Sequence, residues 1–309
     1  MQNTFIEKNL SKYFHNYYIS RTSSGTGALI AILKTLSVES KKNEVIIPSV
    51  VCPSVMFAVN FLGLKPIFID MEVKYFNMCV KDLKKKISKK TLAIIAVHCF
   101  GLTAAIEALI RISKDKKIFL IEDACLNFGG KFKNKYFGSF GDASILSFGY
   151  DKILSENGGA LMIKSKKKFL FAKKFLRKNS EFFDFQFDEK KFQIKFDKLE
   201  EEIEIRKKNA KFFFSNLNSK YLIKPNFRSE DVYWRYPVIY KRNREKLVEK
   251  ANKKQLIITK HYPAINRFQS NSNLKIASLM DGSILNFFIK PGTSKKYIKD
   301  LCLLLKNEK

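Results

Sequence analysis

The chain has 309 residues, of which 46% are hydrophobic, so it can bury a core without disulfide bonds or metal ions to hold it together. Its formal net charge is +29, but 49 of its 58 basic residues are lysines spread over the whole chain, which argues against a dedicated nucleic-acid site. No apolar run approaches the roughly 20 residues that cross a membrane, and no leader pattern opens the chain, so we expect a cytoplasmic protein.

Short apolar runs alternate with helix-like segments from residue 45 to residue 163, a pattern typical of a mainly parallel sheet covered by helices. The expected strands are 45–47, 66–69, 92–97, 118–121, 144–148 and 160–163. The expected helices are 27–36, 53–61, 80–87 and 104–113. The sequence therefore predicts an α/β fold with its ligand site beyond the carboxyl ends of the strands.

After residue 163 the sequence becomes rich in Lys and Phe and has a low-complexity character up to residue 195. A long helix is expected over 196–217, followed by a strand over 236–240 and helices over 244–253 and 294–305. We predict a large domain over 1–195 and a smaller C-terminal α+β domain over 196–309.

The five cysteines and three histidines show no metal-binding pattern. The cysteines fall singly among apolar residues without CxxC spacing, and the histidines lie far apart in sequence. We expect reduced thiols and no metal site.

Two strand ends carry the residues that indicate chemistry. Asp123 follows the apolar run 118–121, and Lys152 lies 29 residues later, just after Ser147 ends another strand. Pyridoxal phosphate (PLP) needs three such groups, namely a carboxylate for the pyridine nitrogen, a hydroxyl for the phosphate and an amine for the Schiff base. Asp123 could instead cap a helix or bind magnesium, and Lys152 is one lysine among many.

A phosphate site is indicated by the small residues Gly25, Thr26 and Gly27, which precede an apolar helical segment. They would place free amides and a hydroxyl at a helix N-terminus, where a dianion is favoured. The same pattern also forms ordinary loops and helix caps, so it supports a phosphate site only together with Asp123 and Lys152.

Seven motifs occur in the order expected of one known family. They are SGTGAL at 24–29, VIIPS at 45–49, GLKPIFID at 63–70, VHCFG at 97–101, IEDA at 121–124, GSFGDA at 138–143 and SFGYDK at 147–152. Together they resemble the DegT/StrS family of PLP-dependent nucleotide-sugar aminotransferases. The resemblance is good over residues 21–163 and patchy afterwards.

The resemblance implies the aspartate-aminotransferase fold, which is fold type I of the PLP-dependent transferases, with a seven-stranded type of sheet. It also implies a homodimer that moves an amino group from an amino acid, commonly glutamate, to a keto-sugar nucleotide in surface polysaccharide or glycan synthesis. Lys152 would be the catalytic Schiff-base lysine and Asp123 the catalytic partner of the pyridine nitrogen.

The remaining site residues also follow from the resemblance. The phosphate would be bound by Ser147, Thr26 and the backbone of 25–27. His261 and Tyr262 resemble a substrate-side segment of the family, although an ordinary turn fits this histidine as well.

Several positions depart from the family pattern. Cys52 stands where an aromatic residue usually stacks on the cofactor, and Leu126 and Phe128 replace a glutamine and a histidine. Asn157 stands where a glutamate is common, and the segment through which a partner subunit donates an asparagine cannot be found between Arg177 and Arg206.

These departures leave several interpretations open. The chain could be an enzyme with a rebuilt, more apolar pocket, a PLP enzyme of another reaction type such as sugar dehydration, or a non-catalytic relative. A binding protein that uses its positive surface is a further alternative. The joint presence of Lys152, Asp123, Ser147 and Thr26 favours an enzyme over a non-catalytic relative, and an aminotransferase is the first hypothesis.

Overall fold

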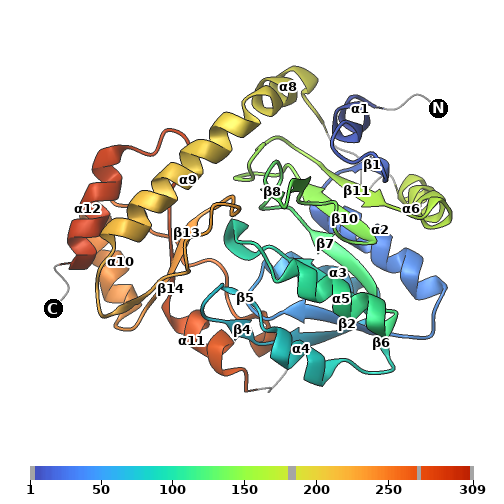
Figure 1. Cartoon of the computed structure of the whole chain (residues 1–309), viewed down its shortest axis with the longest axis horizontal. Coiled ribbons are helices and arrows are strands. Elements are labelled where there is room, and N and C mark those ends of the chain that lie inside the picture. Colours follow the sequence, from blue (N-terminus) through green and yellow to red (C-terminus); the bar gives the residue numbers. More distant parts are fainter. Residues whose placement is uncertain (1–3, 180–185, 270–272, 307–309) are drawn as a thin grey trace.

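A computed structural model describes residues 4–179, 186–269 and 273–306 and shows a seven-stranded sheet between layers of helices (Figure 1). The strands, in sheet order, are β1 (Tyr18–Thr22), β11 (Gly159–Ile163), β10 (Ala143–Ser147), β7 (Phe119–Asp123), β6 (Thr91–Val97), β2 (Glu44–Pro48) and β3 (Lys65–Ile69). The five strands from β10 to β3 are parallel, and only β11 runs against its neighbours. The expected mainly parallel sheet is confirmed, and each expected strand differs from its counterpart by one or two residues at its ends.

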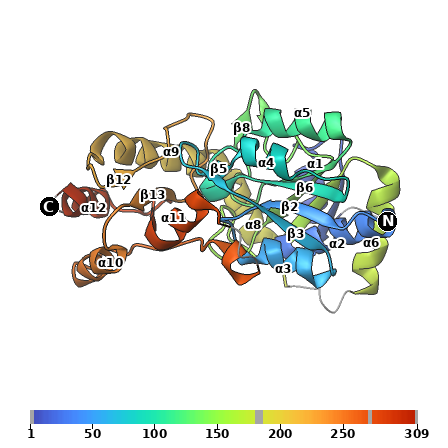
Figure 2. The same cartoon turned by 90° about the horizontal axis from the view of Figure 1, so that it is seen from below.

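Helices cover both faces of this sheet. Figure 2 shows α4 (Val80–Lys86) and α5 (Ile106–Lys116) on one face, with α2 (Gly25–Val38) and α3 (Pro53–Phe61) on the other. Strands β2 and β6 are buried along their whole length, as expected for parallel strands covered on both sides. The expected helix over 53–61 matches α3, whereas α5 begins two residues later than expected.

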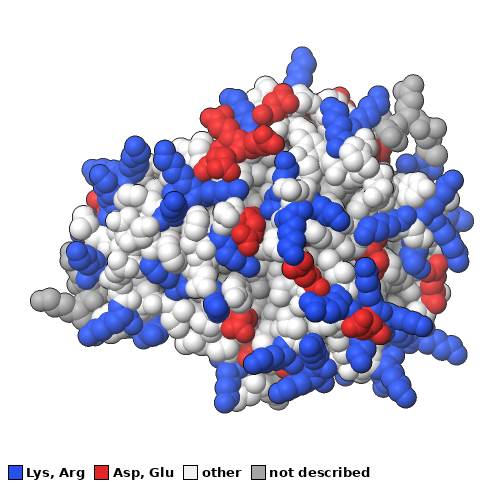
Figure 3. Space-filling model, in the orientation of Figure 1, with Lys and Arg blue, Asp and Glu red and all other residues white. Residues whose placement is uncertain are grey.

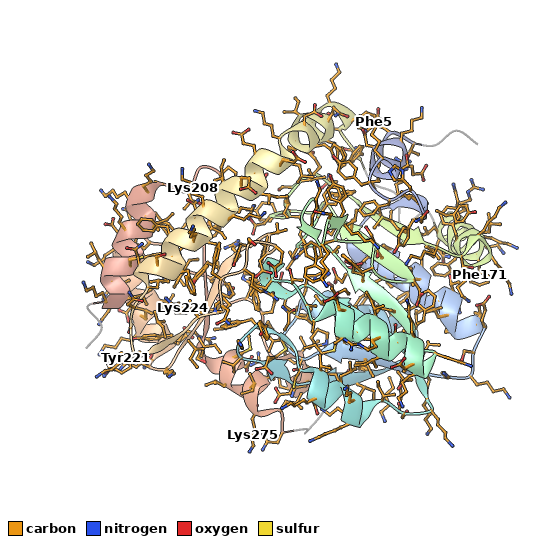
Figure 4. The ribbon with its side chains drawn as sticks, in the orientation of Figure 1. Phe5, Phe171, Lys208, Tyr221, Lys224 and Lys275 are labelled. Atoms are coloured by element: carbon orange, nitrogen blue, oxygen red, sulfur yellow. The ribbon has the colours of Figure 1, made fainter. Side chains whose placement is uncertain are left out.

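The Lys- and Phe-rich segment after residue 163 contains two helices that the sequence analysis missed, α6 (Lys166–Lys178) and α8 (Glu189–Asp197). Each begins at a side-chain cap, Ser165 for α6 and Asp188 for α8. Helix α8 is anchored by Phe192, whose ring meets that of Phe5 edge-on at 6.3 Å. Phe5 begins α1 (Phe5–Ser11) and is labelled in Figure 4. These helices were missed because charged side chains fill most of their positions and only one narrow face is apolar.

The C-terminal section lies at one end of the large sheet (Figure 1). Helix α9 (Leu199–Asn216) leads to a small antiparallel sheet of β12 (Leu222–Ile223), β13 (Tyr236–Tyr240) and β14 (Ile284–Phe287). Helices α10 (Arg244–Lys253), α11 (Lys275–Ser283) and α12 (Lys295–Lys306) surround this sheet. Strand β13 and helix α10 match their expected ranges, whereas β14 and α11 were not expected. The section is α+β, as expected.

Among the contacts that join the C-terminal section to the large sheet, two lie directly after β2 and β3. The carboxylate of Asp70, just after β3, accepts the amides of Ile276 and Ala277 at 3.2 and 2.8 Å, in the first turn of α11. An isolated β-bridge links Val50, after β2, to Ala264. Both contacts lie next to the carboxyl ends of parallel strands, so they bring C-terminal residues to the edge where a ligand site is expected.

The basic side chains are spread over the face shown in Figure 3, while exposed acidic residues gather where α8 meets α9. The acidic residues of this junction are Asp197, Glu200, Glu201 and Glu204. The basic residues form no separate patch on this face, as expected if the positive charge is spread evenly over the surface. In the parts of the chain that the structure describes, no helix is long and apolar enough to cross a membrane.

Candidate functional site

A pocket of about 180 Å³ lies at the carboxyl ends of β6, β7 and β10, against the first turn of α2. It brings together six of the seven residues predicted to bind the cofactor. The lining residues are Gly25, Thr26, Leu29, Val51, Cys52, Ser54, Val55, Val97, Cys99, Asp123, Cys125, Leu126, Ile145, Ser147, Lys152 and Tyr262. Lys152 and Asp123 therefore border the same cavity, although one lies in the loop after β10 and the other ends β7.

A larger hollow of about 860 Å³ lies elsewhere, around Lys114, Lys164 and the start of β7. It is at the opposite ends of the parallel strands and contains none of the predicted site residues. In sheets of this type ligands bind at the carboxyl ends, so we assign the chemistry to the smaller pocket.

Asp123 ends β7 and its side chain faces the pocket, where it is 7% exposed. Its Oδ1 accepts the amide of Cys125 at 3.0 Å, and the thiol of Cys125 also forms a hydrogen bond with the carboxylate. The segment that follows is a series of turns without an α-helix, so Asp123 does not cap a helix. A carboxylate has about four acceptor positions, so Asp123 can still accept a hydrogen bond from a ligand in the pocket.

The neighbouring Glu122 has a structural role. Its Oε1 lies 3.1 Å from Nε2 of His98, and its carboxylate also accepts the amides of Gly138 and Phe140 at 2.6 Å each. The Nδ1 of His98 accepts the amide of Ala104, which assigns the ring proton to Nε2. This fully paired network holds β7 and the turn at 138–141, so the next residue, Asp123, is fixed in its direction.

The N-terminus of α2 forms the phosphate-binding candidate. Ser24 caps the helix by accepting the amide of Gly27 at 3.0 Å, so Gly27 supports the cap and does not line the pocket. The amides of Gly25 and Thr26 have no partner among the described residues and lie at the positive end of a 14-residue helix. A Cβ at Gly25 would come within 3.0 Å of both Cys125 Sγ and Ser147 Cβ, so only glycine lets the helix approach β10 this closely.

Tyr262 lines the pocket and is 7% exposed, and its ring stacks on that of Trp234 at a centroid distance of 5.8 Å and an angle of 12°. Burial raises the pKa of Tyr262 well above its ordinary value, so its hydroxyl stays protonated. His261 does not line the pocket, and its ring meets Trp234 edge-on at 6.2 Å. Burial and then the charge of Arg235 lower the pKa of His261, which favours a neutral imidazole.

Three thiols, Cys52, Cys99 and Cys125, form much of the pocket wall. Burial, followed by the charge of Asp123, raises the pKa of Cys99 and of Cys125, so both remain protonated and weakly polar. Leu126 also lines the pocket, whereas Phe128 packs 6.1 Å from the ring of Phe148. The pocket is therefore largely apolar outside its Asp, Lys, Ser and Thr groups. No cluster of three or more His, Cys, Asp or Glu that could hold a metal ion occurs among the described residues.

Sequence reasoning missed Trp234, Arg235 and Asp151, which gather around Lys152. The Nζ of Lys152 lies 5.7 Å from the centre of the Trp234 ring, and Arg235 forms an ion pair with Asp151. The only available signal was that Trp234 is the single tryptophan of the chain.

Residues 2–180 match the model of the DegT/DnrJ/EryC1/StrS aminotransferase family. A GDP-perosamine synthase of Escherichia coli O157:H7 is 35% identical over 166 residues, which are 54% of this chain and 44% of that protein. A GDP-4-keto-6-deoxy-D-mannose 3-dehydratase of Yersinia pseudotuberculosis is 31% identical over 162 residues, covering 50% and 41% of the two chains. The chain thus spans less than half the length of these curated relatives.

The fold of the whole chain is found in solved structures. An aminotransferase of the same family from Brucella abortus superimposes with a TM-score of 0.87 at 21% identity, over 99% of this chain and 90% of that chain. PseC of Helicobacter pylori, an aminotransferase of pseudaminic acid synthesis, also gives a TM-score of 0.87, at 17% identity over 99% and 91% of the chains. The fold class expected from the motifs is confirmed. The family match covers more than half of the residues, and the chain belongs to the DegT/DnrJ/EryC1/StrS aminotransferase family.

Proposed function

We propose that this protein is a PLP-dependent aminotransferase that moves an amino group from an amino acid, with glutamate as the leading donor, to a keto-sugar nucleotide. The pathway we propose is surface polysaccharide or glycan synthesis. The observation that carries the proposal is the single pocket that joins Lys152 and Asp123 to the N-terminus of α2. The similarity of the first half of the chain to a GDP-perosamine synthase supports the substrate class.

The residues present fit PLP. The carboxylate of Asp123 matches a protonated ring nitrogen, because it is 7% exposed, lines the pocket and has acceptor positions beyond its two contacts with Cys125. The amides of Gly25 and Thr26, with the hydroxyls of Thr26 and Ser147, suit a phosphate dianion. When bound, PLP supplies an electron sink for the carbon that gains or loses the amino group.

Each pocket residue then has a defined task. Lys152 would hold the cofactor covalently, and its amine would remove or return the proton at the substrate carbon that loses or gains the amino group. Asp123 would keep the ring nitrogen protonated, and Tyr262 closes the pocket wall on the side of Trp234. The protonated thiols and Leu126 exclude water from the reacting centre, while Cys52 takes the position of the usual stacking aromatic.

A second candidate function is sugar dehydration on the same scaffold. It is favoured by the similarity to a GDP-4-keto-6-deoxy-D-mannose 3-dehydratase over nearly the same residues. Both candidates need the same cofactor, so the products must distinguish them.

We further propose a homodimer. Phe57 and Phe61 of α3 are 54% and 61% exposed, and their rings lie 5.8 Å apart. The N-terminal residues of the same helix, Ser54 and Val55, line the pocket. An exposed aromatic pair on a pocket-forming helix suits a subunit interface next to the site. Sedimentation of the wild type and of Phe57→Glu/Phe61→Glu tests this, and an unchanged mass in the double variant would argue for another interface.

Two other expectations remain proposals. For the division into 1–195 and 196–309, the support is that β12, β13 and β14 all follow residue 196, although Leu199 and Ile203 of α9 pack in the large-domain core. For a cytoplasmic location, the support is that all five cysteines are free thiols, as is usual in a reducing compartment.

The test of the enzyme proposal is a visible absorption spectrum of purified protein with PLP, followed by borohydride reduction and peptide mapping. We expect a yellow protein, a reduced adduct on Lys152, a spectral change on adding glutamate, and no adduct in Lys152→Ala. Incubation with a panel of keto-sugar nucleotides should then yield amino sugars. Ammonia without amino transfer would favour dehydration, and a protein that stays colourless in excess PLP would contradict both candidates.

A further inference from the structure

The loop that carries Lys152 contains an unusual backbone conformation. Residues 148–158 join β10 to β11 without a helix or strand. Asp151, directly before Lys152, has a φ of 60°, in the left-handed region that residues other than glycine adopt infrequently. Such a conformation persists only where neighbouring contacts hold it. The contacts of Asp151 therefore bear on the direction in which the Lys152 side chain leaves the loop.

Both the backbone and the side chain of Asp151 are held by two consecutive residues from the C-terminal section. The indole Nε1 of Trp234 donates to the carbonyl oxygen of Asp151 at 2.5 Å, and Arg235 forms an ion pair with its carboxylate. Lys290 adds a weaker contact at 3.4 Å to the second carboxylate oxygen. The side chains of Arg235 and Asp151 are only 6% and 17% exposed, so removing either one leaves a largely buried charge without its main charged partner.

These two residues are themselves fixed to the rim of the large sheet. The carbonyl oxygen of Gly101, in the 3-10 turn η1 (Cys99–Gly101) after β6, accepts the amides of Val232 and Tyr233 at 2.9 and 3.1 Å. From the other side, buried Arg206 of α9 donates to the carbonyl oxygen of Trp234 at 2.8 Å. The position of residues 232–235 is thus fixed by contacts that do not involve the loop.

Trp234 also connects the loop to the pocket. Its ring lies 5.7 Å from Nζ of Lys152 and stacks on Tyr262, which lines the cavity. One side chain therefore contacts the amine, the strained residue that precedes it and the wall of the pocket.

We propose that Trp234 and Arg235 form a clamp on Asp151 that directs the Lys152 amine into the pocket. They are positioning residues, because they act through Asp151 and through packing against Lys152. The purpose assigned to Lys152 rests on the proposed function, whereas the contacts of the clamp do not. The competing view is that Arg235 and Asp151 only join the two halves of the chain.

The test compares Trp234→Phe, Arg235→Met and Arg235→Lys with the wild type. Trp234→Phe keeps an aromatic ring and removes the indole donor, and Arg235→Lys keeps the charge. The matched control is Lys195→Met, because Lys195 ties the same loop through Ser155 and Glu156, at 2.7 Å each, without touching Asp151. Each protein is mixed with PLP, the Lys152 adduct is trapped with borohydride over time, and the thermal midpoint is measured in parallel.

We expect the adduct to form at least tenfold more slowly in Trp234→Phe and Arg235→Met, with partial recovery in Arg235→Lys and little change in Lys195→Met. Hydrogen exchange of the PLP-free protein should show faster exchange at residues 149–154 in Trp234→Phe and no change in β10. Wild-type trapping rates in both clamp variants, or an equal loss in Lys195→Met, would overturn the clamp.

The two proposals fail separately. If the wild type binds no PLP, the proposed function is wrong, and the clamp is then judged on the PLP-free protein alone. Its Lys152 is labelled with formaldehyde and cyanoborohydride and quantified by peptide mapping against Lys195. A labelling ratio and loop exchange that are unchanged by Trp234→Phe would overturn the clamp, and a threefold or larger change in either would support it.

Discussion

Replacing Gly101 with alanine should displace the segment that reaches Lys152. Gly101 has a φ of 82°, and a Cβ there would lie 2.3 Å from the backbone nitrogen of Trp234 and 2.9 Å from that of Tyr233. Because both contacts are backbone atoms, no side-chain rotation can relieve them. Residues 232–235 must therefore move away from the rim of the sheet.

The expected loss of stability has two parts. An alanine in the left-handed region costs about 1 kcal/mol. Displacing the segment also weakens the two hydrogen bonds that the Gly101 carbonyl accepts, which adds roughly 1 kcal/mol for each. We expect a total loss of about 3 kcal/mol in the free energy of unfolding.

Gly292 provides a matched control, because its φ is also 82° but no atom lies within 4 Å of its would-be Cβ. Gly292→Ala should lose only the conformational part, about 1 kcal/mol. Urea denaturation gives both values, and the emission of Trp234, the single tryptophan, reports whether the segment has moved. If both variants lose the same free energy of unfolding and the Trp234 emission of Gly101→Ala is unchanged, then the close approach of Gly101 does not hold residues 232–235 in place.

Three further changes test other parts of the molecule. Asp70→Ala should lower the free energy of unfolding by about 1 to 2 kcal/mol, because α11 loses the acceptor of its first amides. Asp70→Asn should lower it less, and urea denaturation measures both values. Asp123→Ala should weaken PLP binding about ten- to a hundredfold in equilibrium dialysis, since a charged hydrogen bond is worth about 1.5 to 3 kcal/mol, and an unchanged affinity would remove Asp123 from the site. Burial raises the pKa of Asp151, but the hydrogen bond and charge of Arg235 outweigh this effect and hold the pKa below 3.8. The ion pair therefore stabilises the fold at pH values above 3.8. The thermal midpoint of the wild type should exceed that of Asp151→Asn at neutral pH, and this difference should vanish as the pH falls through the lowered pKa of Asp151; a difference that persists in acid would contradict the assigned charge pair.

Much of the large sheet could be predicted from the sequence because its strands are continuous apolar runs between helices with clear starts. Strands β2 and β6 are buried on both faces, so the apolar run itself marks them. Ser24 and Pro53 mark the starts of α2 and α3. Helices α6 and α8 were missed because most of their residues are charged, so no wide apolar face marks them in the sequence.

The sequence by itself determined that Asp123, Ser147 and Gly25, the first residue of α2, would meet. Each follows or precedes a parallel strand of the same sheet, and the carboxyl ends of such strands converge on one edge, so local order in the chain is enough to place them together. Only the tertiary structure decided which residues surround Lys152. Trp234 and Arg235 lie more than 80 residues beyond Asp151, on a segment that is fixed by the carbonyl of Gly101 and by Arg206. No periodicity or spacing encodes that contact, because it depends on how the C-terminal section packs against the sheet as a whole.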